Sequence, residues 1–353
     1  MVWTLSVSQA LGGIGVATGL TFSPLIAASI SGSDTLGGLA VTSAVIGAAL
    51  MSIPMARLAA RRGRRPALLA AYGVATCGAA IAAVAVVLGN AVVLVVALLA
   101  FGGSTTAGLA ARYAATDLAE PGRCARDLAL VVWATTLGSV AGPNLAGPAQ
   151  RAAAALGVPG IAGPFLLSGA AFGLAAMTVA VCLRPDPLHV VWADAAQGRT
   201  DVSADPVPRH RRAGWRALCS SSGASLALAG IVLCHTVMVA LMSMTPVHMD
   251  HGGASLEVVG LVISLHIAGM FALSPLIGWF ADRLGRVPVL ALGAVLLVAA
   301  AVVAGSAPFS DAAWLSVGLV LLGVGWSCGL VAGSALLTES VPVAVRPDVQ
   351  GIG

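Results

Sequence analysis

Long apolar segments without charged residues recur along the whole chain, and they constrain the fold more than any other feature. A helix that crosses the hydrocarbon core of a membrane needs about 20 mostly apolar residues. Segments of this length follow one another with short polar interruptions. We place ten of them, at residues 3–29, 36–57, 66–88, 91–113, 128–149, 161–183, 217–245, 257–280, 287–307 and 312–338.

The backbone chemistry of these segments favours helices over strands. Lipid offers no hydrogen-bond partners, so a spanning segment satisfies its own N–H and C=O groups as a helix, whereas barrel strands are shorter and alternate in polarity. Only 9% of the residues are charged, against about 25% in a typical soluble domain. The sequence therefore predicts an all-α polytopic membrane protein.

All 18 basic residues are arginines, and lysine is absent. A P-loop needs a lysine on the phosphates and a Schiff-base enzyme needs a lysine amine, so the sequence excludes both classes. The arginines lie in short clusters between the apolar segments. All of them except Arg151 fall on alternate connections, which is typical of orientation signals and favours a membrane topology over nucleic-acid binding. We expect a multi-pass protein of the plasma membrane with both termini in the cytoplasm.

The chain contains an internal repeat with an offset of 222 residues. The aligned pairs are Ser52 with Ser274, Arg61 with Arg283, Gly63 with Gly285, Arg64 with Arg286, Pro66 with Pro288 and Asp117 with Glu339. Parallel halves of this kind are typical of secondary transporters with a substrate site near the middle of the membrane. We expect a six-helix bundle at 1–183, a cytoplasmic linker at 184–216 and an incomplete four-helix bundle at 217–353.

Two motifs carry a resemblance to a known family. Residues 278–286 read Gly-Trp-Phe-Ala-Asp-Arg-Leu-Gly-Arg, which resembles the G-x-x-x-D-R-x-G-R signature of the major facilitator superfamily. Residues 138–148 are similar to the G-x-x-x-G-P-x-x-G-G element that this superfamily shows in drug and metabolite antiporters. The resemblance covers the whole chain and implies a bundle with two pseudo-symmetric halves, here of six and four transmembrane helices.

Three features depart from the pattern of this family. The first-half copy of the signature has alanine at positions 56 and 60, where the motif has glycine and aspartate. The fourth segment lacks the buried arginine of proton-coupled antiporters, and Arg112 lies at its cytoplasmic end instead. The family usually has twelve helices. The repeat offset places the last two beyond residue 350, so we expect this chain to lack them.

The resemblance implies a cytoplasmic gate in the loop between the eighth and ninth segments. Its residues are Gly278, Asp282, Arg283, Gly285 and Arg286, with Arg61, Gly63, Arg64 and Arg65 in the first-half copy. Asp282 is expected to cap the start of the fifth segment, near residues 127–130, because a helix start presents free N–H groups and positive partial charge. Anchoring of the topology is the alternative, and for the first-half arginines it explains the pattern at least as well.

Charged residues at the segment ends form a second group of candidates. Asp117 and Glu339 occupy equivalent positions of the repeat, and we expect each to pair with the arginine loop of its own half, with Arg112 as a further charge partner. The alternative is a solvated surface acid that contributes little. Glycines and a proline of the fifth segment form a third group, which we expect to make a close-packed seam that limits leakage: Gly138, Gly142, Pro143 and Gly147. Ordinary helix packing is the alternative there.

Ionisable and sulfur-containing side chains inside the seventh and eighth segments are candidates for contact with a substrate or a proton: His235, His266, Met238 and Met242. Neutral histidines bonded to a neighbouring helix and gap-filling methionines are the alternative. Met244, His248, Met249 and His251 extend this group, and a path for a soft metal ion is the weaker interpretation.

We therefore expect a secondary active transporter of the major facilitator type that exports a small, moderately hydrophobic compound by alternating access. A gradient of protons or another ion would drive it, and it would act as a monomer in the bilayer. No catalytic motif is present, so we expect neither an enzyme nor a cofactor or metal. The alternative is a non-transporting, inactive or truncated membrane protein of the same fold.

Overall fold

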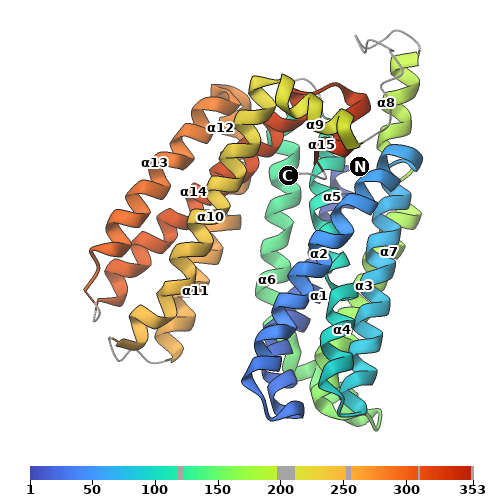
Figure 1. The fold of residues 1–353 in the computed structure, drawn as a ribbon, viewed down its shortest axis with the longest axis vertical. Coiled ribbons are helices and arrows are strands. Elements are labelled where there is room, and N and C mark those ends of the chain that lie inside the picture. Colours follow the sequence, from blue (N-terminus) through green and yellow to red (C-terminus); the bar gives the residue numbers. More distant parts are fainter. Residues whose placement is uncertain (118, 120–121, 197–210, 252–255, 309–310, 351–353) are drawn as a thin grey trace. The chain divides into compact units, whose positions relative to one another are not determined.

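The computed structural model describes the chain except residues 118, 120–121, 197–210, 252–255, 309–310 and 351–353. The described elements are α-helices and two short 3-10 helices, with no strand among them (Figure 1). The α-helices are α1 (Val2–Ser31), α2 (Asp34–Arg62), α3 (Arg64–Val87), α4 (Ala91–Phe101), α5 (Gly103–Asp117), α6 (Cys124–Ala155), α7 (Gly163–Cys182), α8 (Pro187–Ala196), α9 (Arg211–Ser220), α10 (Ser222–His251), α11 (Leu256–Phe271), α12 (Ser274–Leu284), α13 (Arg286–Gly305), α14 (Ala312–Glu339) and α15 (Arg346–Gln350). The predicted all-α class is confirmed.

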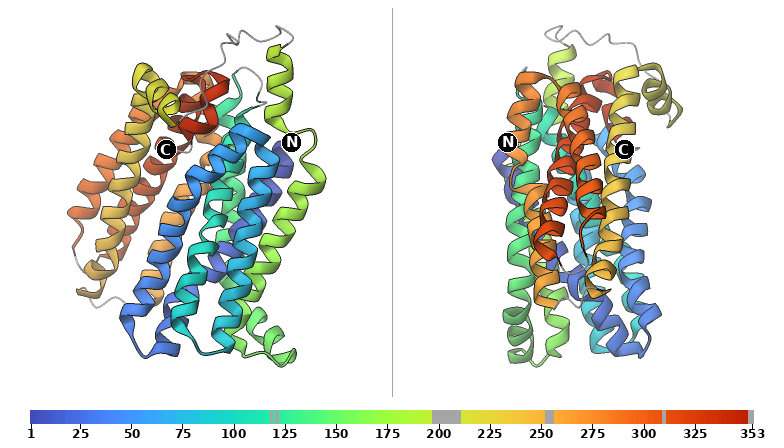
Figure 2. Two further views of the ribbon diagram at one scale, coloured as in Figure 1. Left: turned by 45° about the vertical axis from the view of Figure 1, so that its right-hand side comes forward. Right: turned by 90° about the vertical axis from the view of Figure 1, so that its left-hand side faces the viewer.

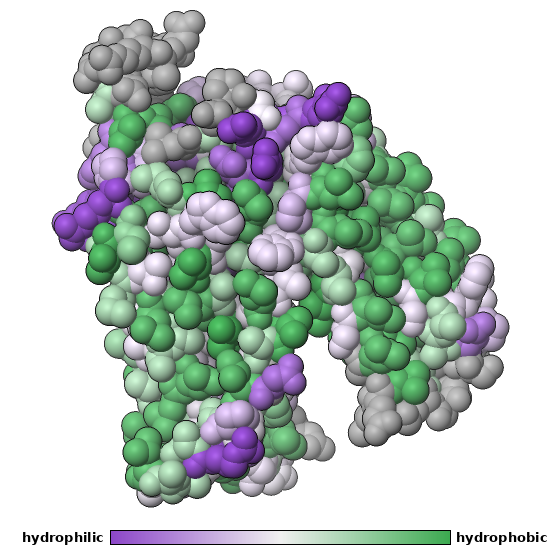
Figure 3. All heavy atoms as spheres, turned by 180° about the vertical axis from the view of Figure 1, so that it is seen from behind, coloured by the Kyte–Doolittle hydropathy of each residue, from purple (hydrophilic) through white to green (hydrophobic). Residues whose placement is uncertain are grey.

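Ten helical stretches of the described chain are long and apolar enough to cross a membrane, as the hydropathy pattern predicts. On the face drawn in Figure 3, hydrophobic residues cover the sides of the helices. The fourth and eighth stretches each consist of two helices, with breaks at Gly102 and at residues 272–273. Gly102 packs closely against α2, because a Cβ there would lie 2.5 Å from the Ala48 nitrogen.

The chain divides into two compact units. The first comprises Met1–Leu118 and Leu137–Pro206, and the second comprises Ala119–Thr136 and Val207–Gly351. The helix α6 therefore begins in the second unit and continues in the first. The segment expected as a linker is partly helical, since it contains α8 and most of α9. The predicted domain boundaries at 183 and 216 remain a prediction.

The first unit is built around α1, α3 and α7, which pack on one another. Three phenylalanine rings form its aromatic core: the ring of Phe101 stands nearly perpendicular to that of Phe165, with centroids 6.5 Å apart, and meets that of Phe172 at 5.0 Å. Gly15 of α1 gives the Phe172 ring its space, because an added Cβ would overlap it. Small residues on α1 thus allow close helix approach, as is usual in membrane bundles.

The second unit is built around α14, which packs on α10, α11 and α13 (Figure 2). Much of α14 is buried, including Trp326, Val331 and Leu337. Two buried apolar clusters meet along it, and one of them extends to the start of α6 through Cys124 and Leu128. This packing fixes the position of the first two turns of α6 within the second unit.

Glycines at equivalent positions of the repeat form the same tight turn in both units. Gly63 separates α2 from α3 with φ 97° and ψ 174°, and Gly285 separates α12 from α13 with φ 100° and ψ 156°. Positive φ of this size is accessible to glycine and costly for other residues. The repeat seen in the sequence is therefore also a repeat of backbone conformation.

Candidate functional site

The centre of the candidate site is Asp282, at the end of α12. Its Oδ1 accepts a hydrogen bond from the Ala125 nitrogen at 3.0 Å, and its Oδ2 accepts one from the Arg126 nitrogen at 2.8 Å. These N–H groups belong to the first turn of α6, where no intrahelical acceptor exists. Asp282 therefore caps α6 with both oxygens, and all three residues lie in the second unit.

Arg286, at the start of α13, holds the Asp282 carboxylate in place. Its Nη2 lies 2.8 Å from Asp282 Oδ1 and donates to Glu339 Oε1 at 2.8 Å, while its Nε donates to Glu339 Oε2 at 3.0 Å. The same guanidinium donates to the Ala281 carbonyl at 2.7 Å. Arg286 thus ties the end of α14 to the capping aspartate through one rigid group.

Glycine at position 278 lets α12 approach the start of α6. A Cβ there would lie 2.6 Å from the Ala129 Cβ and 2.7 Å from the Ala125 carbonyl oxygen, closer than side chains pack. One turn earlier, the Ser274 hydroxyl donates to the Ala129 carbonyl at 3.2 Å. The Arg283 side chain lies over the Trp279 ring, with its guanidinium carbon 5.3 Å from the ring centre.

The first-half arginine loop has different partners. Arg64 forms a bidentate pair with Asp117, with Nε to Oδ2 at 2.7 Å and Nη2 to Oδ1 at 3.2 Å. Arg65 donates to the Ala180 carbonyl of α7 at 2.6 Å, and Arg61 is exposed at the end of α2. The two acids of the repeat thus pair with equivalent arginines, Arg64 and Arg286.

Asp117 binds Arg64 with both carboxylate oxygens. The role of Arg112 as a further charge partner stays a prediction. A charged residue near a helix end does not reveal its partner from the sequence, because several helices meet there.

Asp186 is a site residue that the sequence analysis did not single out. Its Oδ1 accepts from the Arg64 nitrogen at 3.1 Å and from the Leu188 nitrogen at 3.0 Å, and its Oδ2 accepts from the Arg65 nitrogen at 2.7 Å. It caps α3 as Asp282 caps α6. The available signal was an isolated acid directly after the sixth apolar segment, in an arginine-rich part of the chain.

Two of the seam glycines of α6 lie against α1 in the first unit. A Cβ at Gly138 would lie 2.6 Å from the Gly13 Cα, and one at Gly142 would lie 2.6 Å from the Ala17 Cβ. The Thr18 hydroxyl donates to the Gly142 carbonyl at 3.0 Å. Gly147 has space around it, with its nearest neighbour at 3.7 Å. The side chain of Pro143 lies outside the described part of the chain.

The two intramembrane histidines contact α14. The Trp326 Nε1 donates to His235 Nδ1 at 3.2 Å, and His266 Nδ1 lies 2.8 Å from the Leu319 carbonyl. His266 is 2% exposed, and its Nε2 has no hydrogen-bond partner in the described structure. Met238 and Met242 pack against the buried apolar clusters of the second unit, where Met249 is itself buried. The side chains of Met244, His248 and His251 lie outside the described part of the chain.

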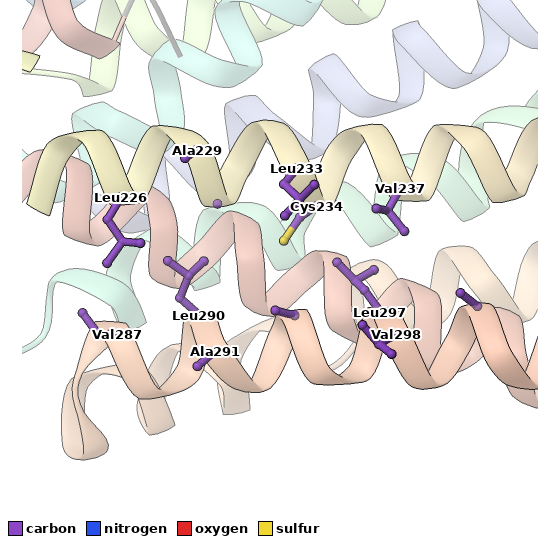
Figure 4. Close-up of a pocket in the computed structure, with 13 residues that line it drawn as sticks. Leu226, Ala229, Leu233, Cys234, Val237, Val287, Leu290, Ala291, Leu297 and Val298 are labelled. Carbon is purple, nitrogen blue, oxygen red and sulfur yellow. The ribbon is translucent and has the colours of Figure 1, made fainter. Parts of the chain in front are cut away.

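An apolar groove of about 540 Å³ runs between α10 and α13 (Figure 4). Under the repeat offset its residues Val237 and Ala301 correspond to Gly15 and Ala79, which contact α7 in the first unit. We therefore interpret the groove as a helix-packing surface rather than a substrate site. Leu226 of α10 points toward α13, and Leu290 and Leu297 of α13 point toward α10.

The chain is similar to known proteins over nearly its full length. It is 37% identical over 350 residues to the uncharacterized MFS-type transporter YdeG of Bacillus subtilis, covering 99% of this chain and 80% of the relative. It is 28% identical to the riboflavin transporter RfnT of Brucella anthropi, covering 98% of this chain and 82% of the relative. Both relatives carry the name of a transporter.

Solved structures show the same fold. The E. coli fucose:proton symporter FucP (N162A) matches with a TM-score of 0.77 at 14% identity, covering 100% of this chain and 88% of that chain. The proton:xylose symporter XylE matches with a TM-score of 0.72 at 16% identity, covering 99% and 86%. A family model of the Major Facilitator Superfamily matches residues 5–353. The chain therefore belongs to the major facilitator superfamily, as a multi-pass membrane protein with the fold of a secondary transporter.

Proposed function

We propose that this protein exports a small, moderately hydrophobic compound by alternating access, driven by an ion gradient. The observation that carries the proposal is the capping of α6 by Asp282. The two hydrogen bonds must break before the start of α6 can part from the end of α12, and a hydrogen bond to a charged group contributes about 1.5–3 kcal/mol. Such a cap suits a cytoplasmic gate, because it is stable when closed and can be broken in each cycle.

The chemistry of the interior supports the proposed substrate class. Arg64 and Arg286 are already bound to carboxylates. Phosphorylated or multiply charged substrates need several cationic partners. His235 and His266 are the candidate proton carriers, because imidazole titrates near physiological pH. We further propose that the protein works as a monomer in the plasma membrane with both termini in the cytoplasm.

The alternative of a non-transporting membrane protein is not favoured. The similarity to transporters extends over 98% or more of the chain. The name of one relative makes riboflavin a suitable first probe. Riboflavin is fluorescent, so its movement can be followed in either direction.

The proposal is tested with purified protein in liposomes under an imposed pH gradient. Flux of riboflavin and of a lipophilic DNA dye is measured for the unchanged chain, for Asp282→Asn and for Asp311→Asn. Asp311 is a matched control, because it caps α14 through a single bond to the Trp314 nitrogen at 2.9 Å. We expect Asp282→Asn to reduce flux at equal abundance and Asp311→Asn to leave it unchanged. Equal flux in all three proteins would contradict the gate.

A further inference from the structure

A cavity lies beside the capping aspartate, Asp282. This cavity, of about 300 Å³, is lined by Gly122, Arg123, Arg126, Trp279, Asp282 and Arg283. All six residues belong to the second unit. The cavity therefore lies between the chain that enters α6 and the last turns of α12, and the capping Asp282 forms part of its lining.

The lining of this cavity is positively charged. It carries three arginines and one aspartate, and both oxygens of that aspartate already accept hydrogen bonds from the Ala125 and Arg126 backbone nitrogens. Arg126 and Arg283 are exposed, and neither forms an ion pair with a carboxylate in the described structure. Guanidinium groups with free donors bind phosphate oxygens in pairs. The cavity thus suits a phosphate group.

Apolar side chains place this cavity at the level of the lipid headgroups. The candidate membrane spans Cys124–Gly142 and Leu261–Leu284 both end at it. Trp279 is 41% exposed and Phe280 38% exposed on the last turns of α12. Tryptophan prefers the boundary between headgroups and hydrocarbon, and basic pockets between transmembrane helices bind acidic lipid heads. A soluble phosphate would make no use of the two exposed rings.

We propose that this cavity binds the phosphodiester headgroup of an anionic membrane lipid. Arg126 and Arg283 bind the phosphate oxygens, and Trp279, which already stacks against Arg283, lies along the glycerol and the upper acyl chain. Because one arginine is on α6 and the other on α12, the bound lipid strengthens the closed state of the Asp282 cap. Only this effect on the cap rests on the transport function proposed above; the binding itself does not.

The test measures how many lipids stay bound to the purified protein in native mass spectrometry. The protein is reconstituted in phosphatidylcholine, in phosphatidylcholine with phosphatidylglycerol, and in phosphatidylcholine with soluble glycerol phosphate. The double variant Arg126→Gln/Arg283→Gln is compared with Arg57→Gln/Arg62→Gln, whose two arginines are exposed on α2. Arg283→Lys serves as a milder variant that keeps the charge and loses the planar fork.

We expect retention of phosphatidylglycerol in the unchanged protein and in the α2 control. Retention should fall roughly 25-fold in the double variant, because each of the two basic residues near an anionic surface contributes about a factor of five. Retention in Arg283→Lys should lie between that of the unchanged protein and that of the double variant. This milder variant keeps the test valid if the double variant does not fold. Equal retention in all variants overturns the proposal, as does binding of glycerol phosphate without preference for the lipid. Lipid binding without any transport would contradict only the proposed function.

Discussion

Arg64 and Asp117 form a buried bidentate ion pair, with side chains 3% and 1% exposed and 2.7 Å between Nε and Oδ2. The equivalent pair of the repeat, Arg286 and Glu339, has the same two-point geometry with a carboxylate that is 41% exposed. One interaction therefore occurs in two environments within one chain. Water is excluded from the first pair and reaches the second. Loss of the first pair should therefore lower the free energy of unfolding more than loss of the second.

We expect Asp117→Asn to destabilise the protein far more than Glu339→Gln. Removing one partner of a buried pair costs about 3–5 kcal/mol, because a charge stays buried without its counterion. Removing a half-exposed carboxylate costs about 1 kcal/mol or less, since water replaces it. The apparent melting temperature of the two variants in one detergent measures the difference. A similar shift in both would show that burial does not decide the strength of these pairs.

Loosening the Asp282 cap should expose Cys124. This cysteine is the first residue of α6, 7% exposed, and it packs against Ala281 in the same buried cluster. In a background where the exposed cysteines 77, 182 and 219 are serine, Asp282→Asn should raise labelling of Cys124 by an impermeant maleimide about tenfold, the equivalent of 1.4 kcal/mol. Asp311→Asn is the control. An unchanged rate of Cys124 labelling in Asp282→Asn would show that the cap does not keep the start of α6 closed.

A methyl group at position 278 should prevent the close approach of α12 to α6. The added Cβ would meet the Ala125 carbonyl at 2.7 Å, and a backbone atom cannot move aside as a side chain can. We expect Gly278→Ala to lower the melting temperature and to raise Cys124 labelling. Gly305→Ala is the matched control, because nothing lies within 4 Å of its added Cβ. If both variants behave alike, helix propensity and not contact explains the result.

Much of the fold follows from hydropathy and repetition, and the site follows in part. The ten spanning helices could be predicted because lipid selects long apolar helices. Asp282 is expected from the sequence to cap residues 127–130, and it caps Ala125 and Arg126 instead. The difference arises because α6 begins at Cys124. Its first turn contains charged residues, which a search for apolar segments leaves out. The role of Asp282 as a gate remains a prediction.

What the sequence could not reveal depends on contacts between distant residues. Asp186 reaches the start of α3 across 121 and 122 residues of sequence, and no local pattern marks such a partner. The close approach of Gly102 to the backbone of α2 is likewise a contact that hydropathy does not describe. The orientation of His266 toward Leu319 also depends on which helix is the neighbour.

Asp186→Asn should open the start of α3. The carboxylate accepts three backbone N–H groups, and loss of a helix cap costs about 0.5–2 kcal/mol. We expect faster hydrogen exchange of the Arg64, Arg65 and Leu188 amides, with unchanged exchange in the second unit. Exchange that rises everywhere would indicate global destabilisation, and exchange that rises nowhere would show that water replaces the cap.

Variants of His266 can distinguish a structural role of this side chain from a role in proton transfer. Its Nδ1 lies 2.8 Å from the Leu319 carbonyl, while the buried Nε2 has no hydrogen-bond partner in the described structure. Asparagine places an amide nitrogen near the position of Nδ1, so it can donate the hydrogen bond, but it cannot take up a proton. Leucine can neither donate the hydrogen bond nor take up a proton. We therefore expect His266→Asn to keep most of the thermal stability, and His266→Leu to lose about 0.5–1.5 kcal/mol because the additional hydrogen bond to the Leu319 carbonyl is removed. If Nε2 carries the coupling proton, His266→Asn abolishes flux driven by a pH gradient and keeps substrate exchange without a gradient. Gradient-driven flux that survives in His266→Asn would remove this histidine from the coupling mechanism and leave it as a link between α11 and α14.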